Sequence, residues 1–240
     1  MKFDSFSSSS RANLYCVTAA NGKRLLIECG CTWKKLQKAL NHDLSDIVGC
    51  LLTHEHKDHS KCVEDVLENG IDVYASAGTF DALGVVHRKA LRIYDMERFT
   101  IDDMFMIFPF PVNHDANEPL GFIVVENGSL ESLLFVTDTS HIKQKFGLAF
   151  SIIALCCNYD GDLLRKREEA GEINTEFAKR LLTSHMERGV TKKYIADSCN
   201  LSKCTEIHLL HMSGDNIAQE AVRAEFENEF IVKTHIAGRR

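Results

Sequence analysis

In the stretch LLTHEHKDH, residues 51–59, an apolar segment is followed directly by four side chains that can bind a metal ion. In an extended chain, residues two apart point to the same side, so His54 and His56 can hold one ion together. Asp58 and His59 then fall at the start of a following helix, where they can face a second ion. Imidazole and carboxylate ligands suit zinc, and they also suit manganese or iron. Because four ligands follow one apolar strand, this spacing favours a metal site over a charged surface loop.

Three later segments repeat this arrangement, in which a polar ligand directly follows an apolar strand in the sequence. The candidate ligands are His114 after residues 104–112, Asp138 after residues 131–136 and His211 after residues 206–210. Strand ends on one edge of a sheet are a common place for binding sites. Together with the first cluster they make seven ligands, which is about what two ions need if one carboxylate bridges them.

The composition describes an ordinary globular chain. Its 240 residues include 28 Lys and Arg against 34 Asp and Glu, which gives a formal net charge of −6, and 45% are hydrophobic. These values exclude a disordered chain and a polybasic nucleic-acid tail. No apolar run approaches the ~20 residues that span a bilayer, and the first ten residues contain no apolar stretch of signal-peptide length. We therefore expect a cytoplasmic protein without a membrane partner, whose nine cysteines, with no C-x-x-C pair, are free and mostly buried.

Strands and helices alternate along the chain. Strands are predicted at 14–18, 24–28, 47–53, 71–75, 104–112, 121–126, 131–136, 150–156, 206–210 and 230–233, and helices at 32–40, 60–68, 160–170, 174–186, 191–198 and 216–229. Strands occur in both halves with helices after each group, which favours a layered α/β sandwich over a doubly wound sheet. Because no linker and no internal repeat interrupts this pattern, we predict a single domain over residues 1–240.

The order and spacing of the ligand motifs resemble the metallo-β-lactamase superfamily. The resemblance implies an α/β fold, the αββα sandwich of two mixed β-sheets flanked by helices. It also implies two divalent metal ions, zinc first and manganese as the alternative. One ion would lie on His54, His56 and His114, the second on Asp58, His59 and His211, and Asp138 would bridge them.

Four further segments narrow the resemblance. FSSSSRANLYC (6–16), NHDANEPLGF (113–122), CNYDGDLL (157–164) and HMSGDN (211–216) resemble the YycJ/WalJ group, which has members proposed as exonucleases, and the phage anti-Pycsar proteins, which hydrolyse cyclic mononucleotides. Asp138, in place of a cysteine ligand, resembles the hydrolase and phosphodiesterase branches. Cys156 stands where related bacterial proteins usually carry a glutamate, so no role of that glutamate is transferred here.

These motifs predict a metal-dependent phosphodiesterase, since two nearby metal ions activate water for in-line displacement at phosphorus. The first expectation is hydrolysis of cyclic mononucleotide signals such as cCMP, cUMP, cAMP or cGMP to linear nucleotides. Such an enzyme would evade Pycsar-type antiphage defence, in the host cytoplasm if it is phage-encoded. A net acidic chain with interspersed basic residues favours this small substrate over a nucleic-acid backbone. The alternative is a WalJ-like exonuclease on DNA or RNA. A non-catalytic metal-binding protein and a lactam or thioester hydrolase are weaker alternatives, and the anti-Pycsar resemblance also implies a homodimer.

Two residues are candidates for catalytic work beyond metal binding. Asp58 is expected to orient the attacking water as well as to bind metal. His185 lines up with a G-H-L-S-like segment of the relatives, which implies a general acid or a phosphate contact, while a role at the surface end of a helix is equally open.

Ser8, Asn13 and Asn158 are candidates for contact with substrate. Residues 7–10 with Asn13 could form a loop whose backbone N–H groups meet a phosphate, or they could be a simple N-terminal turn. For His141 the structural interpretation is favoured over a supporting role near Asp138. His208 is expected to be structural, because the alternation of a strand points it away from His211.

Overall fold

The computed structural model describes residues 1–239, and these fall into two compact units. Unit 1 comprises residues 1–111 and 116–132 with the C-terminal residues from 238, and unit 2 comprises residues 112–115 and 133–237. The predicted α/β class is confirmed in each of them. The single domain over 1–240 stays a prediction.

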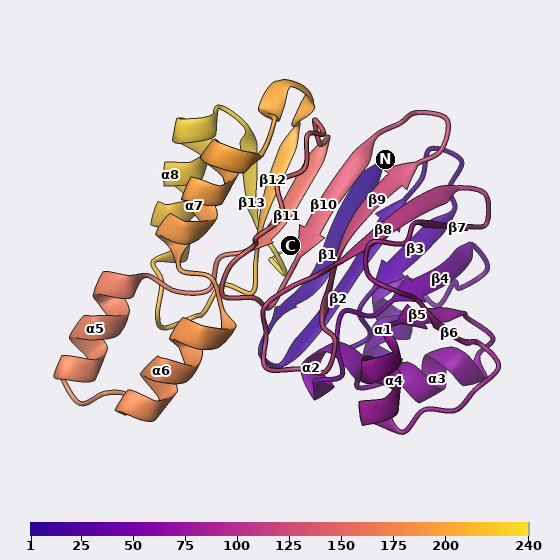
Figure 1. Ribbon diagram of the computed structural model, residues 1–240, viewed down its shortest axis with the longest axis horizontal. Helices are drawn as coiled ribbons and strands as arrows, with labels where there is room; N and C mark the ends of the chain where they lie inside the picture. The colour runs from indigo at the N-terminus through magenta and orange to yellow at the C-terminus, as the bar shows by residue number, and fades with distance from the viewer. Residues whose placement is uncertain (240) are drawn as a thin grey trace. The chain divides into compact units, whose positions relative to one another are not determined.

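Unit 1 contains a six-stranded mixed sheet in the order β1-β2-β3-β4-β5-β6 (Figure 1). Its strands are β1 (Lys2–Ser9), β2 (Ala12–Thr18), β3 (Arg24–Ile27), β4 (Ile47–Leu51), β5 (Val73–Ala75) and β6 (Ala90–Arg92). Neighbouring strands are antiparallel from β1 to β3 and parallel from β3 to β6. Asn21-Gly22 falls in the tight turn between β2 and β3, and Gly22 takes a φ of 89° there.

Four short helices accompany this sheet: α1 (Trp33–Ala39), α2 (Lys57–Ser60), α3 (Val63–Glu68) and α4 (Ala77–Leu83). One apolar core joins sheet and helices, with Leu26, Leu36, Leu52, Val66 and Phe80 almost fully buried in it. Three further strands of this unit are antiparallel neighbours in the order β9-β8-β7; they are β7 (Phe99–Ile101), β8 (Phe105–Pro111) and β9 (Leu120–Glu126).

Unit 2 is built on four parallel strands in the order β10-β11-β12-β13. They are β10 (Ser132–Val136, whose first residue belongs to unit 1), β11 (Ile152–Cys156), β12 (Glu206–Leu210) and β13 (Lys233–Ile236). Every residue of β10 and β11 is buried, which is why both read as continuous apolar runs in the sequence. The helices are α5 (Gly161–Glu169), α6 (Thr175–Ser184), α7 (Arg188–Ser198) and α8 (Gln219–Phe230), with a 3₁₀ turn at Leu201–Lys203; α8 packs against β13 (Figure 1).

The structure differs from the sequence-based prediction at several elements. The serine run of residues 7–9 ends a long strand, β1, instead of forming a loop. The helix predicted over 60–68 is two short helices, because Cys62 takes a non-helical conformation between α2 and α3. The last strand begins at Lys233 and not at Phe230, because α8 continues to Phe230 and ends at Ile231 in a left-handed conformation.

No helix in residues 1–239 is long and apolar enough to cross a membrane.

Candidate metal centre

The ligand cluster of unit 1 forms where the parallel strands β3 and β4 end together. Ile27 pairs with Leu51 in register, so the residues after both strands meet at one edge of the sheet. His54 and His56 follow β4 in an extended segment, and their ring centroids lie 4.7 Å apart. Asp58 and His59 belong to the short helix α2, as the sequence predicted, with 3.3 Å between Asp58 Oδ2 and His59 Nε2. The structure therefore brings all four predicted ligands of this segment together.

A buried carboxylate, Glu28, orients the histidines of this cluster. Its side chain accepts a hydrogen bond from the Thr53 hydroxyl at 2.5 Å and lies 3.1 Å from Nδ1 of His59. The same hydroxyl is 2.8 Å from Nδ1 of His54. Because the hydroxyl hydrogen points to Glu28, the imidazole must supply the hydrogen to Thr53. Both histidines therefore direct Nδ1 toward Thr53 or Glu28 and leave Nε2 on the other side of the ring, the usual arrangement around a bound metal.

Asn13 supports the same cluster from β2. Its Nδ2 lies 3.0 Å from His59 Nε2, 3.2 Å from the Asp58 carbonyl and 3.3 Å from Asp58 Oδ2. The Tyr15 hydroxyl donates to Asn13 Oδ1 and also bonds Ser8 Oγ at 2.7 Å. Asn13 is fully buried and Ser8 nearly so. Both candidate substrate contacts thus lie in a hydrogen-bonded chain that ends at Asp58 and His59, which suits a positioning role.

The ligand cluster of unit 2 collects at the carboxyl ends of its parallel strands. Asp138 follows β10, Asn158 follows β11 and His211 follows β12. His211 Nε2 lies 3.6 Å from Asp138 Oδ1, and His114 Nε2 lies 3.9 Å from Asp138 Oδ2. His114 is brought there because Asn113 and Thr139 exchange two hydrogen bonds of 3.1 Å. All three side chains are almost fully buried.

His114 shows the same orientation as the histidines of unit 1. Its Nδ1 lies 3.2 Å from the carbonyl oxygen of Ser184, which can only accept, so Nδ1 carries the hydrogen and Nε2 faces Asp138. Three of the five predicted histidine ligands therefore direct Nδ1 toward an oxygen atom of the protein, the orientation usual for imidazoles that bind a metal through Nε2. This donor chemistry of imidazole and carboxylate fits a divalent cation of the zinc type.

His185 and Asn158 lie next to these ligands. His185 ends α6, stacks on the His211 ring at a centroid distance of 4.9 Å and places Nδ1 3.7 Å from Asp138 Oδ1. Asn158 Nδ2 lies 2.6 Å from the His211 carbonyl and 3.1 Å from its Nδ1. This contact helps to hold His211 at a φ of 54°, a left-handed conformation that costs a non-glycine residue about 1–2 kcal/mol.

Cys156 also borders this cluster, offering a sulfur within 4.8 Å of ligand atoms of Asp138 and His185. Burial and the nearby Asp138 charge raise the pKa of this thiol to about 12. His141 is exposed and contacts Ser140, in keeping with a structural role. Glu28 and Thr53 are the residues that sequence reasoning missed. The one signal for Glu28 was an acidic residue at the end of an apolar strand.

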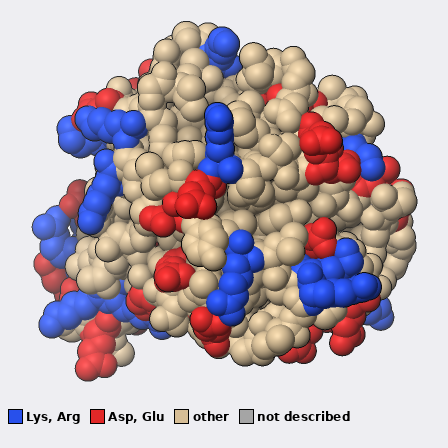
Figure 2. Space-filling view, turned by 45° about the vertical axis from the view of Figure 1, so that its right-hand side comes forward, with Lys and Arg blue, Asp and Glu red and all other residues tan. Residues whose placement is uncertain are grey.

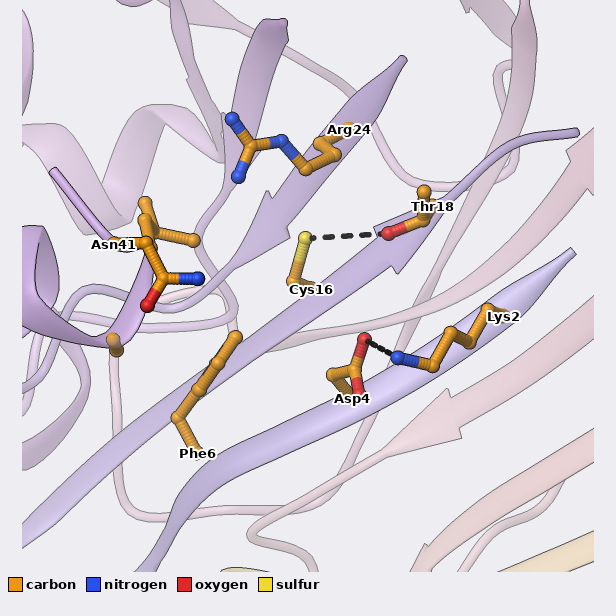
Figure 3. Close-up of a pocket in the computed structure, with 9 residues that line it drawn as sticks. Lys2, Asp4, Phe6, Cys16, Thr18, Arg24 and Asn41 are labelled. Carbon is orange, nitrogen blue, oxygen red and sulfur yellow. Dashed lines mark hydrogen bonds and ion pairs between the residues drawn. The ribbon is translucent and has the colours of Figure 1, made fainter. Parts of the chain in front are cut away.

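A surface pocket of unit 1 lies away from the ligand cluster of the same unit (Figure 3). It contains the Lys2–Asp4 ion pair of 2.9 Å together with Cys16 and Arg24. Arg24 pairs with Ile47 at the start of β4, whereas His54 follows the end of that strand, so the pocket is at the opposite end of the sheet.

The fold and the ligand clusters define the class of the molecule. Solved structures of several proteins share its fold. YhfI from Bacillus subtilis, a metallo-β-lactamase fold protein, has a TM-score of 0.74 at 14% identity and covers 98% of this chain and 95% of its own. Zinc-bound PqqB from Methylobacterium extorquens has a TM-score of 0.69 at 14% identity and covers 99% of this chain and 97% of its own. A diphosphatase of the PhnP family has a TM-score of 0.66 at 16% identity and covers 98% of this chain and 94% of its own.

The sequence comparison gives the family. The profile of the Beta-lactamase superfamily domain matches residues 23–197, and the chain belongs to that superfamily, whose members include metal-dependent hydrolases. Among named proteins, exodeoxyribonuclease WalJ of Streptococcus pneumoniae serotype 2 is 26% identical over 95% of this chain and 87% of its own length. Exodeoxyribonuclease YycJ of Bacillus anthracis is 27% identical over 93% of this chain and 86% of its own length. The predicted resemblance to this group and the predicted fold are both confirmed.

Proposed function

We propose that this protein is a two-metal phosphodiesterase that removes nucleotides from DNA ends. The observation that carries phosphodiester hydrolysis is the ligand set, seven imidazoles and carboxylates, of which three histidines are oriented by contacts at Nδ1. The sequence likeness to two exodeoxyribonucleases over more than nine-tenths of the chain supports DNA as the substrate.

We assign the ligands to two divalent ions as the family resemblance implies. By that resemblance, His54, His56 and His114 would hold one ion, Asp58, His59 and His211 would hold the other, and Asp138 would contribute to both. Bound ions of this kind lower the pKa of water and neutralise charge on a phosphoryl group. The chain itself contributes Glu28, Thr53, Asn13 and Asn158, whose hydrogen bonds hold the ligand rings and Asp58 in place.

His185 is our candidate to protonate the leaving oxygen. It lies beside Asp138 and stacks on His211, yet 14% of its side chain is accessible, against 5% for Asp138 and 3% for His211. A side chain in that position can reach solvent for its proton and still face a substrate held over Asp138. A positioned general acid of this kind contributes typically about 10²–10⁴-fold to a rate.

Cyclic mononucleotides are the second candidate substrate, and the charge of the molecule favours them. The net charge is −6, and in the face shown in Figure 2 Lys and Arg side chains lie intermixed with Asp and Glu instead of forming a stripe. Proteins that follow a phosphate backbone usually present a basic surface. A single small phosphodiester needs no such surface.

A substrate panel distinguishes these candidates. Protein loaded with Zn²⁺ or Mn²⁺ is offered end-labelled single- and double-stranded DNA, RNA, 2′,3′- and 3′,5′-cyclic nucleotides and a chromogenic lactam. We expect stepwise shortening of DNA, and digestion of cyclic nucleotides with intact DNA would reverse the order of the two candidates.

Variants test the metal centre itself. His56→Ala and Asp138→Ala should lose activity together with bound metal. His185→Ala should keep its metal and lose at least about 10²-fold in kcat with little change in KM. His42→Ala, which alters an exposed histidine, is the matched control. Full activity of the metal-free protein would refute the proposal.

A further inference from the structure

A second group of metal-ligand side chains lies on β12 and β13 of unit 2. Glu206 and His208 are two residues apart on β12 and therefore point to the same side. His235 on β13 is the register partner of His208, which places it on that side as well. The pairing of two parallel strands thus gathers two imidazoles and one carboxylate at neighbouring positions of one sheet face.

The distances within this group suit a small cation. Glu206 Oε2 lies 2.9 Å from His208 Nε2 and 3.9 Å from His235 Nε2, and one ligand atom from each residue lies within 4.8 Å of the others. The two rings stack with 4.7 Å between centroids and 15° between planes, so both present Nε2 toward the same carboxylate. Zinc bonds of about 2.0–2.1 Å at tetrahedral angles separate neighbouring ligand atoms by about 3.3 Å. The observed distances bracket that value.

This group is separate from the candidate centre around Asp138. His211 follows the end of β12, about 10 Å along the strand from His208, and it contacts Asp138 and His185, whereas His208 contacts Glu206 and His235. His208 is 7% exposed, whereas about a third of the Glu206 and His235 side chains is accessible. An ion can therefore reach the group from solvent and still find a largely buried ligand.

We propose that Glu206, His208 and His235 bind a divalent transition-metal ion of the zinc type. Two histidines and one glutamate form a common three-residue ligand set for zinc, with a fourth position left to water. Such an ion joins β12 to β13 at the paired positions of His208 and His235 and stabilises the strand, β12, that His211 follows. The proposal concerns a site outside the candidate centre and does not depend on what the protein hydrolyses.

Zinc stoichiometry tests this proposal. The full chain is stripped with a chelator, loaded with excess Zn²⁺ and freed of unbound metal, and zinc per chain is measured by mass spectrometry. His235→Gln and Glu206→Gln should each retain one equivalent fewer than the wild type. His42→Gln, an exposed histidine outside both groups, should retain the wild-type amount. Because the readout is a difference of one equivalent, it holds whatever number of ions the candidate centre takes.

A second measurement covers the case in which a variant unfolds. In the wild-type chain, Zn²⁺ should shift the ring resonances of both His208 and His235 in a histidine-detected NMR spectrum, and it should do so in a His56→Ala background that weakens the candidate centre. Equal zinc in the wild type and both folded variants overturns the proposal. Unshifted His208 and His235 resonances at saturating zinc overturn it as well.

Discussion

Gly30 lies so close to the backbone of Asp58 that a side chain has no room there. A Cβ built on Gly30 would lie 1.5 Å from the Asp58 carbonyl oxygen and 2.7 Å from the His59 nitrogen. Neither atom can rotate away, because both belong to the backbone of α2. We expect Gly30→Ala to displace α2, to reduce metal binding at Asp58 and His59, and to destabilise the fold by about 1–3 kcal/mol or more. Urea unfolding and bound zinc measure the two effects.

Gly147 provides the matched control for this prediction. A Cβ at that position would meet no heavy atom within 4 Å, and its φ does not require glycine. Gly147→Ala should therefore keep the wild-type urea midpoint and zinc content. If Gly30→Ala behaved in the same way, the close approach of residue 30 to α2 would not govern the metal ligands.

The sequence predicted the ligand residues better than the residues that orient them. His54, His56, Asp58 and His59 could be found because they lie within six residues of the chain and follow an apolar strand. Glu28 and Thr53 escaped notice because their role depends on the register of β3 against β4, which places residues 25 positions apart in hydrogen-bonding distance. Such pairings are long-range, and a single sequence does not encode them in any local pattern.

At the scale of elements, Asp160 joins the start of α5 to α7. Its side chain accepts hydrogen bonds from the backbone N–H groups of Asp162 and Leu163, and it pairs with Arg188 at 2.6 Å. Burial alone would raise the pKa of Asp160, but the Leu163 N–H and the Arg188 charge outweigh it and hold the pKa below its ordinary value. The folded state therefore favours the ionised form.

We predict that this arrangement stabilises the fold only when Asp160 is ionised. Since the folded pKa is depressed, the contribution is complete above the unfolded value of about 3.9 and is lost as the pH falls through the lower folded value. Asp160→Ala should cost about 0.5–2 kcal/mol at pH 7 through loss of the cap. Asp160→Asn, which keeps a capping oxygen, should cost less, and its difference from the wild type should vanish at low pH. Urea unfolding from pH 7 to 3 measures this, and a difference that grows toward low pH would contradict it.

Element boundaries were predictable where local signals were strong. β12 was predicted at its observed limits, 206–210, because an apolar run begins and ends there abruptly. β1 was missed because a run of serines has little strand preference of its own. It forms because residues 2–9 pair with β2, with a register shift between Ser5 and Ser7. Tertiary pairing there decides what local propensity leaves open.

At the scale of the whole molecule, the nine cysteines are free thiols distributed over both units. Seven are buried, and only Cys199 and Cys204 are half-buried. Burial raises the pKa of Cys16 and Cys204 to about 11 and that of Cys156 and Cys199 to about 12. The thiolate is the reactive form, and a thiol of pKa 11 is only about 0.1% ionised at pH 8.

We therefore expect the native protein to react slowly with a disulfide reagent at pH 8, and to do so first at Cys199 and Cys204. All nine thiols should react at once after unfolding in guanidinium, since burial alone protects them. Mass spectrometry of partly labelled protein identifies the sites. Rapid native labelling of Cys156 would contradict the prediction and would indicate an accessible, ionised sulfur beside Asp138. Slow labelling would instead agree with sulfur atoms that only pack in the core, while imidazoles and carboxylates bind metal and substrate.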